Sequence, residues 1–237
     1  MNLKNYSLTD TQEQRLINSV KAALAIPFID SLEDFIWEGI FCYTKTLELA
    51  DPLLGIRSKR LFDVVDANNK IGWSAKAVQW NFKEGGEFEL VIQRADVFKK
   101  ANILGFPNLS IHSDPNEIGQ ALLKHWQNKV DEDANYQNVT DKRVCILIKN
   151  ANNKKFAYFE EELAAYDVTA IFWRWTDTTK TGLQGIRQSD NFCAYRWYPN
   201  QKQFFERFKF DKGSFTFEIE PKRIDLNAII DFLNEKI

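Results

Sequence analysis

Apolar residues recur every three or four positions in the first part of the chain, which is the spacing of an amphipathic helix. Residues 7–26 follow this spacing after a candidate N-cap at Ser7 or Thr9. Residues 31–50 follow it again after Ser31, which can cap a second helix. The pattern therefore predicts two helices in succession at the start of the chain.

The pattern then changes to short runs of branched and aromatic residues, which are typical of β-strands. Residues 61–65 and 71–80 form two such runs, and the Asn- and Asp-rich stretch 66–70 between them predicts a hairpin turn. Paired glycines introduce 85–94 as a third strand, which could instead continue into a helix through 95–103.

A helix and a strand follow this hairpin region. Residues 113–133 have a candidate cap at Ser113 or Asp114 and a capping-box acid at Glu117. Residues 143–150 are an unbroken apolar run of the kind that is buried on both faces of a sheet. The order helix, strand, strand, third strand, helix, strand predicts a central mixed β-sheet flanked by helices, in the α/β or α+β class.

Length and composition fit a single domain. The 237 residues are 44% hydrophobic and 14% aromatic, enough for a full core, and the six prolines and ten glycines leave no long flexible linker. We expect one domain over 1–237, with a core at about 31–150 and an extension at 151–237. The net charge of −2 favours no nucleic-acid partner, although a basic cleft can lie on an acidic body.

The three cysteines, Cys42, Cys145 and Cys193, are far apart and have no metal-binding spacing. Each lies in an apolar or aromatic run, so we expect buried free thiols and a reducing compartment. The N-terminal residues lack the apolar core of a signal peptide, and no run approaches membrane-spanning length. We therefore expect a cytoplasmic protein without a membrane partner.

The hairpin combines apolar strands with charged residues. A turn of about five residues would bring Asp63 roughly opposite 72–74, and strand alternation places Ser74 and Lys76 on one face while Ala75 points away. Whether Asp63 joins that face depends on the register. A carboxylate beside the Ala75 carbonyl suits Mg²⁺, with water and phosphate as the other ligands, and a lysine there could orient an attacking water.

These residues resemble a known family. The segment 62–76, FDVVDANNKIGWSAK, resembles the catalytic hairpin of the PD-(D/E)XK nucleases, specifically the type II restriction endonucleases. The helix, three strands, helix and strand of their shared core match the order predicted for about 32–149. The resemblance implies a Mg²⁺-dependent, sequence-specific endonuclease acting on double-stranded DNA as a homodimer. It implies that Asp63, the Ala75 carbonyl and a glutamate hold the metal while Lys76 positions water.

The chain departs from the family pattern at two positions. No proline precedes Asp63, and Ser74 occupies the position of the second acid, either as a participant or as an ordinary strand residue. Some members with Ser-x-Lys carry the glutamate about thirteen residues after the lysine, where this chain has Glu89. The other candidate is Glu38, on the helix before the hairpin. Glu89 ranks slightly above Glu38, and both could contribute.

Basic and amide side chains supply the candidates for DNA contacts. Near the hairpin, the predicted phosphate contacts are Arg57, Lys59, Arg60 and Lys83. The segment 182–191 and a later turn offer residues that could read base edges, namely Gln184, Arg187, Gln188, Asn191, Asn200 and Lys202. The aromatic residues of 196–208 could stack on bases, but their density favours a place in the core.

Two other interpretations stay open. The same core could belong to a repair or resolvase-type nuclease. Alternatively, Asp63 and Lys76 could form a structural cross-strand ion pair in a non-catalytic module that binds DNA or protein. Ser74, in place of an acid, is the feature that supports this last interpretation.

Overall fold

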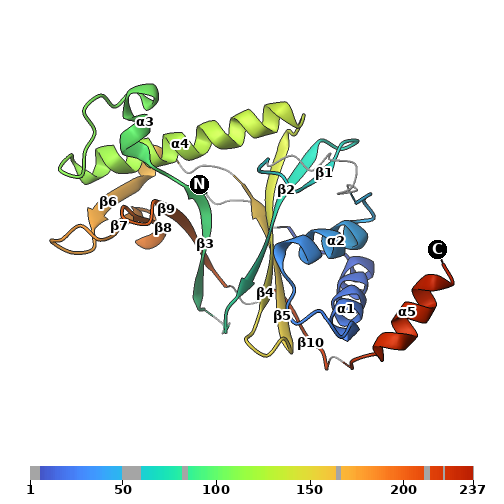
Figure 1. The fold of residues 1–237 in the computed structure, drawn as a ribbon. Helices are drawn as coiled ribbons and strands as arrows, with labels where there is room; N and C mark the ends of the chain where they lie inside the picture. The colour runs from blue at the N-terminus through green and yellow to red at the C-terminus, as the bar shows by residue number, and fades with distance from the viewer. Residues whose placement is uncertain are drawn as a thin grey trace. The chain divides into compact units, whose positions relative to one another are not determined.

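The computed structural model describes residues 6–49, 60–81, 85–163, 167–210, 214–220 and 222–236 (Figure 1). The chain divides into two compact units. We call residues 3–82, 136–163 and 213–237 the hairpin unit, and residues 83–135 and 164–212, with 1–2, the inserted unit. The sequence predicts one domain, whereas the structure distributes the predicted strands between two units.

The hairpin unit contains a five-stranded sheet in the order β1-β2-β4-β5-β10. Its strands β2 and β4 are parallel and all other neighbours are antiparallel, so the sheet is mixed as predicted. The strands are β1 (Val64–Asp66), β2 (Ile71–Gln79), β4 (Asp141–Lys149), β5 (Lys155–Glu162) and β10 (Phe215–Glu218). The helices are α1 (Asp10–Ala25), α2 (Asp34–Lys45) and α5 (Leu226–Asn234).

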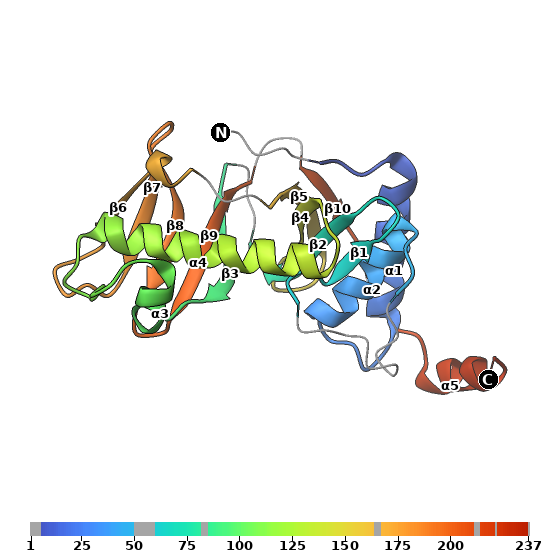
Figure 2. The same ribbon diagram turned by 90° about the horizontal axis from the view of Figure 1, so that it is seen from above.

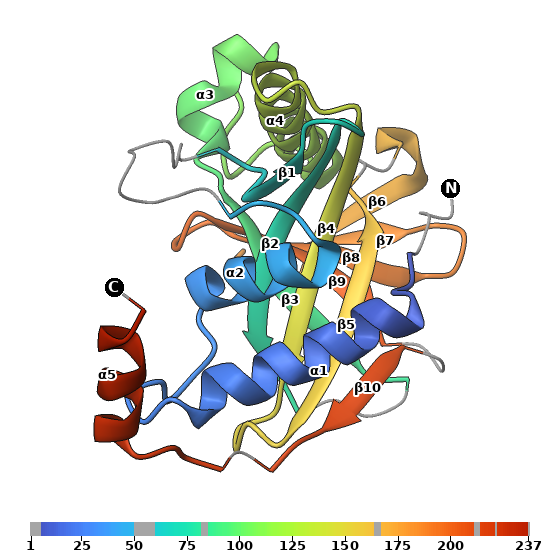
Figure 3. The ribbon, with the colours of Figure 1, turned by 90° about the vertical axis from the view of Figure 1, so that its right-hand side faces the viewer.

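Helices α1 and α2 cover one face of this sheet (Figure 3). Helix α1 begins after Thr9, whose hydroxyl accepts a hydrogen bond from the Gln12 amide in a capping box. Helix α2 packs Trp37 and Phe41 against the sheet. The Phe41 ring lies edge-on to the Trp73 ring, and the two ring centroids are 5.4 Å apart. The aromatic side chains of α2 therefore fix the helix against the strand that carries the predicted catalytic lysine.

The inserted unit contains an antiparallel five-stranded sheet in the order β3-β9-β8-β7-β6. Its strands are β3 (Glu87–Arg94), β6 (Ile171–Trp175), β7 (Leu183–Arg187), β8 (Phe192–Tyr198) and β9 (Gln203–Lys209). Its helices are α3 (Val97–Leu104), α4 (Pro115–Tyr136) and the short 3-10 helix η2 (Val168–Ala170).

The long helix α4 lies along one face of the inserted unit's sheet (Figure 2). Gly119 allows this close packing, because a Cβ atom at this position would lie 2.2 Å from the Trp173 ring. The Asn116 side chain accepts a hydrogen bond of 2.9 Å from the Trp173 amide, which joins the start of α4 to β6.

The predicted elements are mostly present, but one strand has another partner. The β1–β2 hairpin is confirmed, with Val64 opposite Trp73. The predicted third strand is β3, which pairs with β9 instead of extending the hairpin sheet. The molecule is thus a mixed α/β structure with two sheets. In the described ranges, no helix is both long enough and apolar enough to cross a membrane.

Candidate functional site

Strand β2 is much longer than β1, and this difference exposes part of its edge. The pairing of the two strands ends where the Asp63 amide donates to the Trp73 carbonyl at 2.9 Å. Alternate residues of a strand direct their backbone groups to the same side, so Ala75 and Ala77 face the same edge as Trp73. Their amides need acceptors that β1 does not supply.

Two carboxylates supply those acceptors. Asp63 Oδ2 accepts from the Ala75 amide at 2.9 Å, and Asp34 Oδ1 accepts from the Ala77 amide at 2.9 Å. The Ala75 carbonyl belongs to the same strand edge, between the two amides. The edge of β2 therefore brings together oxygen atoms from two aspartates and one backbone carbonyl.

Lys76 binds two of these oxygen groups. Its Nζ lies 3.1 Å from Asp63 Oδ2 and 3.1 Å from the Ala75 carbonyl oxygen. The Lys76 and Asp63 side chains are 31% and 22% exposed, so solvent or a ligand can reach both. Ala75 is buried in the core below α1 and α2, as the predicted alternation requires, and Ser74 is buried as well.

The start of helix α2 is fixed by a lysine from the neighbouring strand. Lys149 Nζ donates to the Ser31 hydroxyl and to the Leu32 carbonyl, both at 2.6 Å. The N-cap of α2 is Glu33, so the prediction that Ser31 caps this helix is wrong. Lys149 instead holds the segment that leads directly into Asp34.

The pKa of Asp63 reflects this environment. Burial raises it above the usual range of an aspartate, the charge and hydrogen bond of Lys76 oppose that rise, and the charge of Asp34 adds to it. Asp34 is therefore close enough to repel the Asp63 carboxylate. A bound cation would relieve this repulsion.

The oxygen groups at this edge have the chemistry that a small divalent cation prefers. Asp63 Oδ1 and Asp34 Oδ2 accept no hydrogen bond from the described residues. Mg²⁺ takes few protein oxygens and completes its shell with water and phosphate. No group of three or more His, Cys, Asp or Glu side chains within metal-binding reach occurs in the described part of the chain. The oxygen donors at the edge of β2 are instead the carboxylates of Asp34 and Asp63 and the carbonyl of Ala75.

Sequence reasoning missed Asp34. It lies three residues after Ser31, where an acid is ordinary because it interacts favourably with the N-terminus of a helix. A search for acids at the start of the helix that precedes the hairpin would have found it. Glu38, the predicted acid of this helix, is one turn further on and buried. Burial, followed by the charge of Glu38, raises the pKa of Cys42 to about 11.

The structure places Glu89 in a different environment from Asp63. Glu89 lies on β3 in the inserted unit, whereas Asp63 belongs to the hairpin unit. Its carboxylate is 3.4 Å from Arg196 Nη1 and 3.5 Å from Arg207 Nε. Within the hairpin unit, the acid that accompanies Asp63 is Asp34.

The basic residues predicted around the hairpin are described only in part. Arg60 stacks its guanidinium on the Tyr136 ring, with 3.8 Å to the ring centroid. The remaining three predicted phosphate contacts, Arg57, Lys59 and Lys83, lie outside the described residues.

The predicted base-reading segment is largely a strand and a tight turn. Gln184 and Arg187 lie on β7, and Arg187 pairs with Asp190 at 2.7 Å. Lys202 pairs with Asp96 at 2.7 Å, which joins the β8–β9 turn to the start of α3. The other predicted contacts lie near these strand ends, namely Gln188, Asn191 and Asn200.

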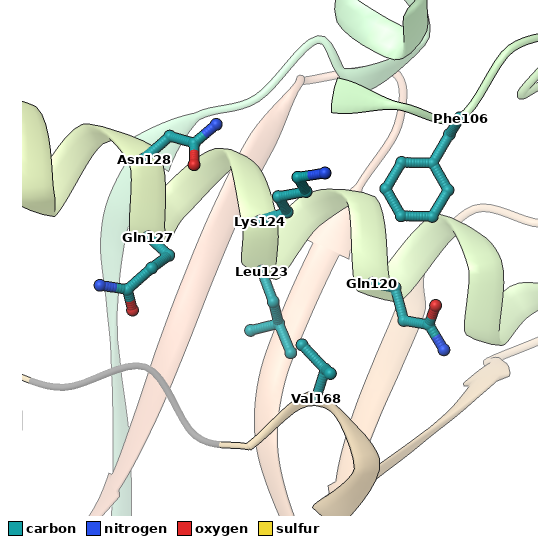
Figure 4. Close-up of a pocket in the computed structure, with 7 residues that line it drawn as sticks. All are labelled: Phe106, Gln120, Leu123, Lys124, Gln127, Asn128 and Val168. Atoms are coloured by element: carbon teal, nitrogen blue, oxygen red, sulfur yellow. The ribbon is translucent and has the colours of Figure 1, made fainter. Parts of the chain in front are cut away.

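A pocket of about 320 Å³ lies beside α4 in the inserted unit (Figure 4). Leu123, Lys124 and Val168 line it together with Phe106 and amide side chains. Its lining includes no carboxylate, histidine or cysteine, so it contains no second set of acid–base or metal-binding groups.

Comparisons with protein-family models, with curated proteins and with solved structures find no match to this chain.

Proposed function

We propose that this chain is a Mg²⁺-dependent, sequence-specific endonuclease that hydrolyses phosphodiester bonds of double-stranded DNA. The observation that carries the proposal is the convergence of Asp34, Asp63 and the Ala75 carbonyl on one strand edge beside Lys76. The resemblance of 62–76 to the catalytic hairpin of type II restriction endonucleases supports it. Asp34 would supply the acid that Ser74 cannot supply.

The residues at the strand edge have separate roles in this proposal. Asp34, Asp63 and the Ala75 carbonyl would hold Mg²⁺, which supplies positive charge at the scissile phosphate. Lys76 would transfer its hydrogen bonds from Asp63 and Ala75 to the attacking water or to a phosphate oxygen. Its ammonium would then orient that water and stabilise the negative charge on the non-bridging phosphate oxygens in the transition state. Its reach to both oxygens at 3.1 Å supports this role.

Cleavage of a duplex requires two events, one on each strand, so we propose that two copies of the chain act together. Helix α5 and the residue two positions before it supply an apolar surface for self-association. Five large side chains there are between 44% and 57% exposed, namely Ile224, Leu226, Ile230, Phe232 and Leu233. Sedimentation of the wild type and of an Ile230→Asp variant tests this part, with a monomeric variant expected.

Digestion of a large DNA with Mg²⁺ tests the proposed activity. We expect discrete fragments from the wild type and a loss of about 10²- to 10³-fold or more in rate from each of Asp34→Asn, Asp63→Asn and Lys76→Ala, by analogy with the removal of one group that stabilises a transition state. Asp10→Asn is the matched control, because Asp10 is an exposed acid that begins α1 as Asp34 begins α2. Equal cleavage by the wild type and the three variants would refute the assignment.

Two further variants separate the acids that the sequence proposes. Glu38→Gln and Glu89→Gln should cleave at rates close to that of the wild type if Asp34 is the second acid. Loss of cleavage in Glu89→Gln with intact cleavage in Asp34→Asn would instead support Glu89. A wild type that cuts branched DNA but gives no discrete fragments from linear DNA would support a repair or resolvase-type nuclease on the same core.

A non-catalytic binding module is the second candidate function. The direct contact of 3.1 Å between Lys76 and Asp63 favours it, because the pair is complete without a metal or substrate. Isothermal titration with Mg²⁺ distinguishes the two functions. Binding that is lost in Asp63→Asn supports the nuclease, whereas no binding by the wild type together with intact DNA supports the module.

A further inference from the structure

The strands of the inserted unit alternate between a buried face and an open face. Side chains such as Leu90, Trp173 and Trp197 are buried on the face that α4 covers. The side chains between them point to the opposite face, and on every strand some of them are exposed or half-exposed, although Ile186 on β7 is buried. We call this opposite side of the sheet the open face.

The strand register shows which side chains are neighbours on the open face. Residues directly opposite each other on paired strands point to the same side of a sheet. One row crosses all five strands, from β6 to β3, through Arg174, Gln184, Arg196, Phe205 and Val91. The adjacent row crosses three strands through Tyr198, Gln203 and Arg94. These two rows of the open face are therefore continuous surfaces of arginine, glutamine and apolar side chains, and Glu87 and Glu89 lie on the same face of β3 in ion pairs with Arg207 and Arg196.

The arginines at the two edges of the open face supply positive charge that its acids do not pair. Arg174 on the β6 edge and Arg94 on the β3 edge are exposed, and neither has an ion-pair partner among the described residues. Arg196, between them, is paired with Glu89 at 3.4 Å. Five strands span about 19 Å, from four spacings of roughly 4.8 Å. That width exceeds the major groove of about 12 Å, which admits only a helix or a two-stranded ribbon. The sheet would therefore lie over the groove, with the edge arginines at the phosphates on either side and its long central side chains pointing into the groove.

The residues between the two edge arginines are of the types that read bases. Glutamine makes two hydrogen bonds to adenine, arginine makes two to guanine, and apolar groups contact the thymine methyl. Gln184 and Gln203 have no hydrogen-bond partner for their side chains among the described residues. Tyr198 and Phe205 pack edge to face with centroids 5.5 Å apart, which makes one compact apolar contact rather than two separate stacking platforms. This arrangement fits a duplex groove better than a splayed single strand.

We infer that the open face is the surface with which the chain reads double-stranded DNA. The inference rests on the proposed function only for the identity of the ligand. Arg94 and Arg174 would contact phosphates, and Gln184 would contact a base edge. Gln184 is also one of the base-reading residues that the sequence predicts, although it lies on a strand rather than in a loop.

The test uses the full chain with Lys76→Ala, so that binding is measured without cleavage. A random pool of DNA duplexes is selected for binding, and affinities for the selected sequence are measured by fluorescence anisotropy at several salt concentrations. We expect Arg174→Gln and Arg94→Gln each to weaken binding to all sequences and to reduce the slope of log K against log salt by about 0.9. We expect Gln184→Ala to lose about 5- to 150-fold in discrimination at one base position.

Lys21→Gln is the matched control, because Lys21 is an exposed cation on α1 whose removal changes the net charge equally. Affinities that are unchanged in the open-face variants, or reduced as much in Lys21→Gln, would overturn the inference. Tighter binding of single-stranded RNA, or no duplex binding at all, would also overturn it. The proposed nuclease activity is tested separately with the wild-type chain, in which Lys76 is present. If that chain binds the selected duplex but does not cut it, the nuclease proposal fails while the inference about the open face stands.

Discussion

Replacing Glu160 by glutamine tests the support beneath the candidate site. The Glu160 carboxylate is completely buried on β5. It accepts hydrogen bonds from four side chains, namely Lys45 at 2.9 Å, Trp73 at 2.7 Å, Arg143 at 3.0 Å and Tyr158. Since Trp73 lies two residues before Ala75, this network holds β2 from the side of the sheet opposite to Lys76.

The expected cost follows from the burial of the two cations. Lys45 and Arg143 are 11% and 14% exposed, and glutamine would leave both without the charge of Glu160. Removing one partner of a buried ion pair costs about 3–5 kcal/mol. Arg143 keeps a second carboxylate, Asp141, so we expect a value near the lower end, about 3 kcal/mol. Glutamine has nearly the shape of glutamate, so no cavity adds to this loss.

Native-state hydrogen exchange measures this loss within the hairpin unit. The amides of Ile146 and Leu147 in the middle of β4 should exchange about 150-fold faster in Glu160→Gln. Glu218→Gln is the control on a strand of the same sheet, because Glu218 pairs with Lys155 while the two are 69% and 55% exposed. Such a surface pair contributes about 0–1 kcal/mol, so exchange should accelerate by less than about 6-fold. Equal acceleration in both variants would refute the reasoning.

The same network predicts a dependence on pH. Burial alone would raise the pKa of Glu160, but the charge of Lys45 and the hydrogen bonds from Tyr158 and Trp73 lower it below the usual range. A depressed pKa in the folded state contributes stability above the pKa of the unfolded chain, near 4.3, and this stability is lost as the pH falls through the folded value. The difference in stability between wild type and Glu160→Gln should therefore shrink in acid.

Two more predictions concern close packing and the Asp63 carboxyl. Gly119→Ala should destabilise the inserted unit by about 1–3 kcal/mol, because its methyl group would overlap the Trp173 ring. In Gly39→Ala the added Cβ atom would have no neighbour nearer than 3.9 Å, so we expect the free energy of unfolding to rise by up to about 1 kcal/mol. Thermal denaturation measures both variants, and an equal change in stability in the two would contradict this reasoning. Lys76→Met should move the ¹³C NMR titration of Asp63 to higher pH, since Lys76 lowers that pKa; an unchanged midpoint would exclude their contact.

Much of the hairpin unit can be predicted from the sequence, because the turn residues, capping residues and apolar spacing that define each of its elements lie close together in the chain. The Asn- and Asp-rich turn fixes the β1–β2 pairing, and the capping residues fix the start of α1 and the approximate start of α4. The helical spacing of Phe35, Ile36, Ile40 and Tyr43 likewise predicts α2, although Phe35 and Tyr43 are exposed in the structure. Such signals identify the elements, but they leave the register of the hairpin open, and it is the structure that places Asp63 beside Lys76.

The partner of β3 could not be predicted in the same way. Its alternation shows which side chains are buried, but an alternating strand can pair with any strand of matching pattern. Its partner β9 lies more than a hundred residues further along the chain, and the pairing moves Glu89 to a different unit from Asp63. Asp34 was missed for a related reason, because its contact with the Ala77 amide joins residues 43 positions apart.

The candidate site is organised by backbone groups rather than by side-chain packing. Each aspartate is held through one carboxylate oxygen by an amide of β2, which leaves its other oxygen for a ligand. Those amides need acceptors whether or not a cation is bound, because a strand edge without a partner has unpaired donors. The short β1 therefore explains both features at once. It leaves the edge of β2 open, and the carboxylates that satisfy this edge are the groups arranged to bind a cation beside Lys76.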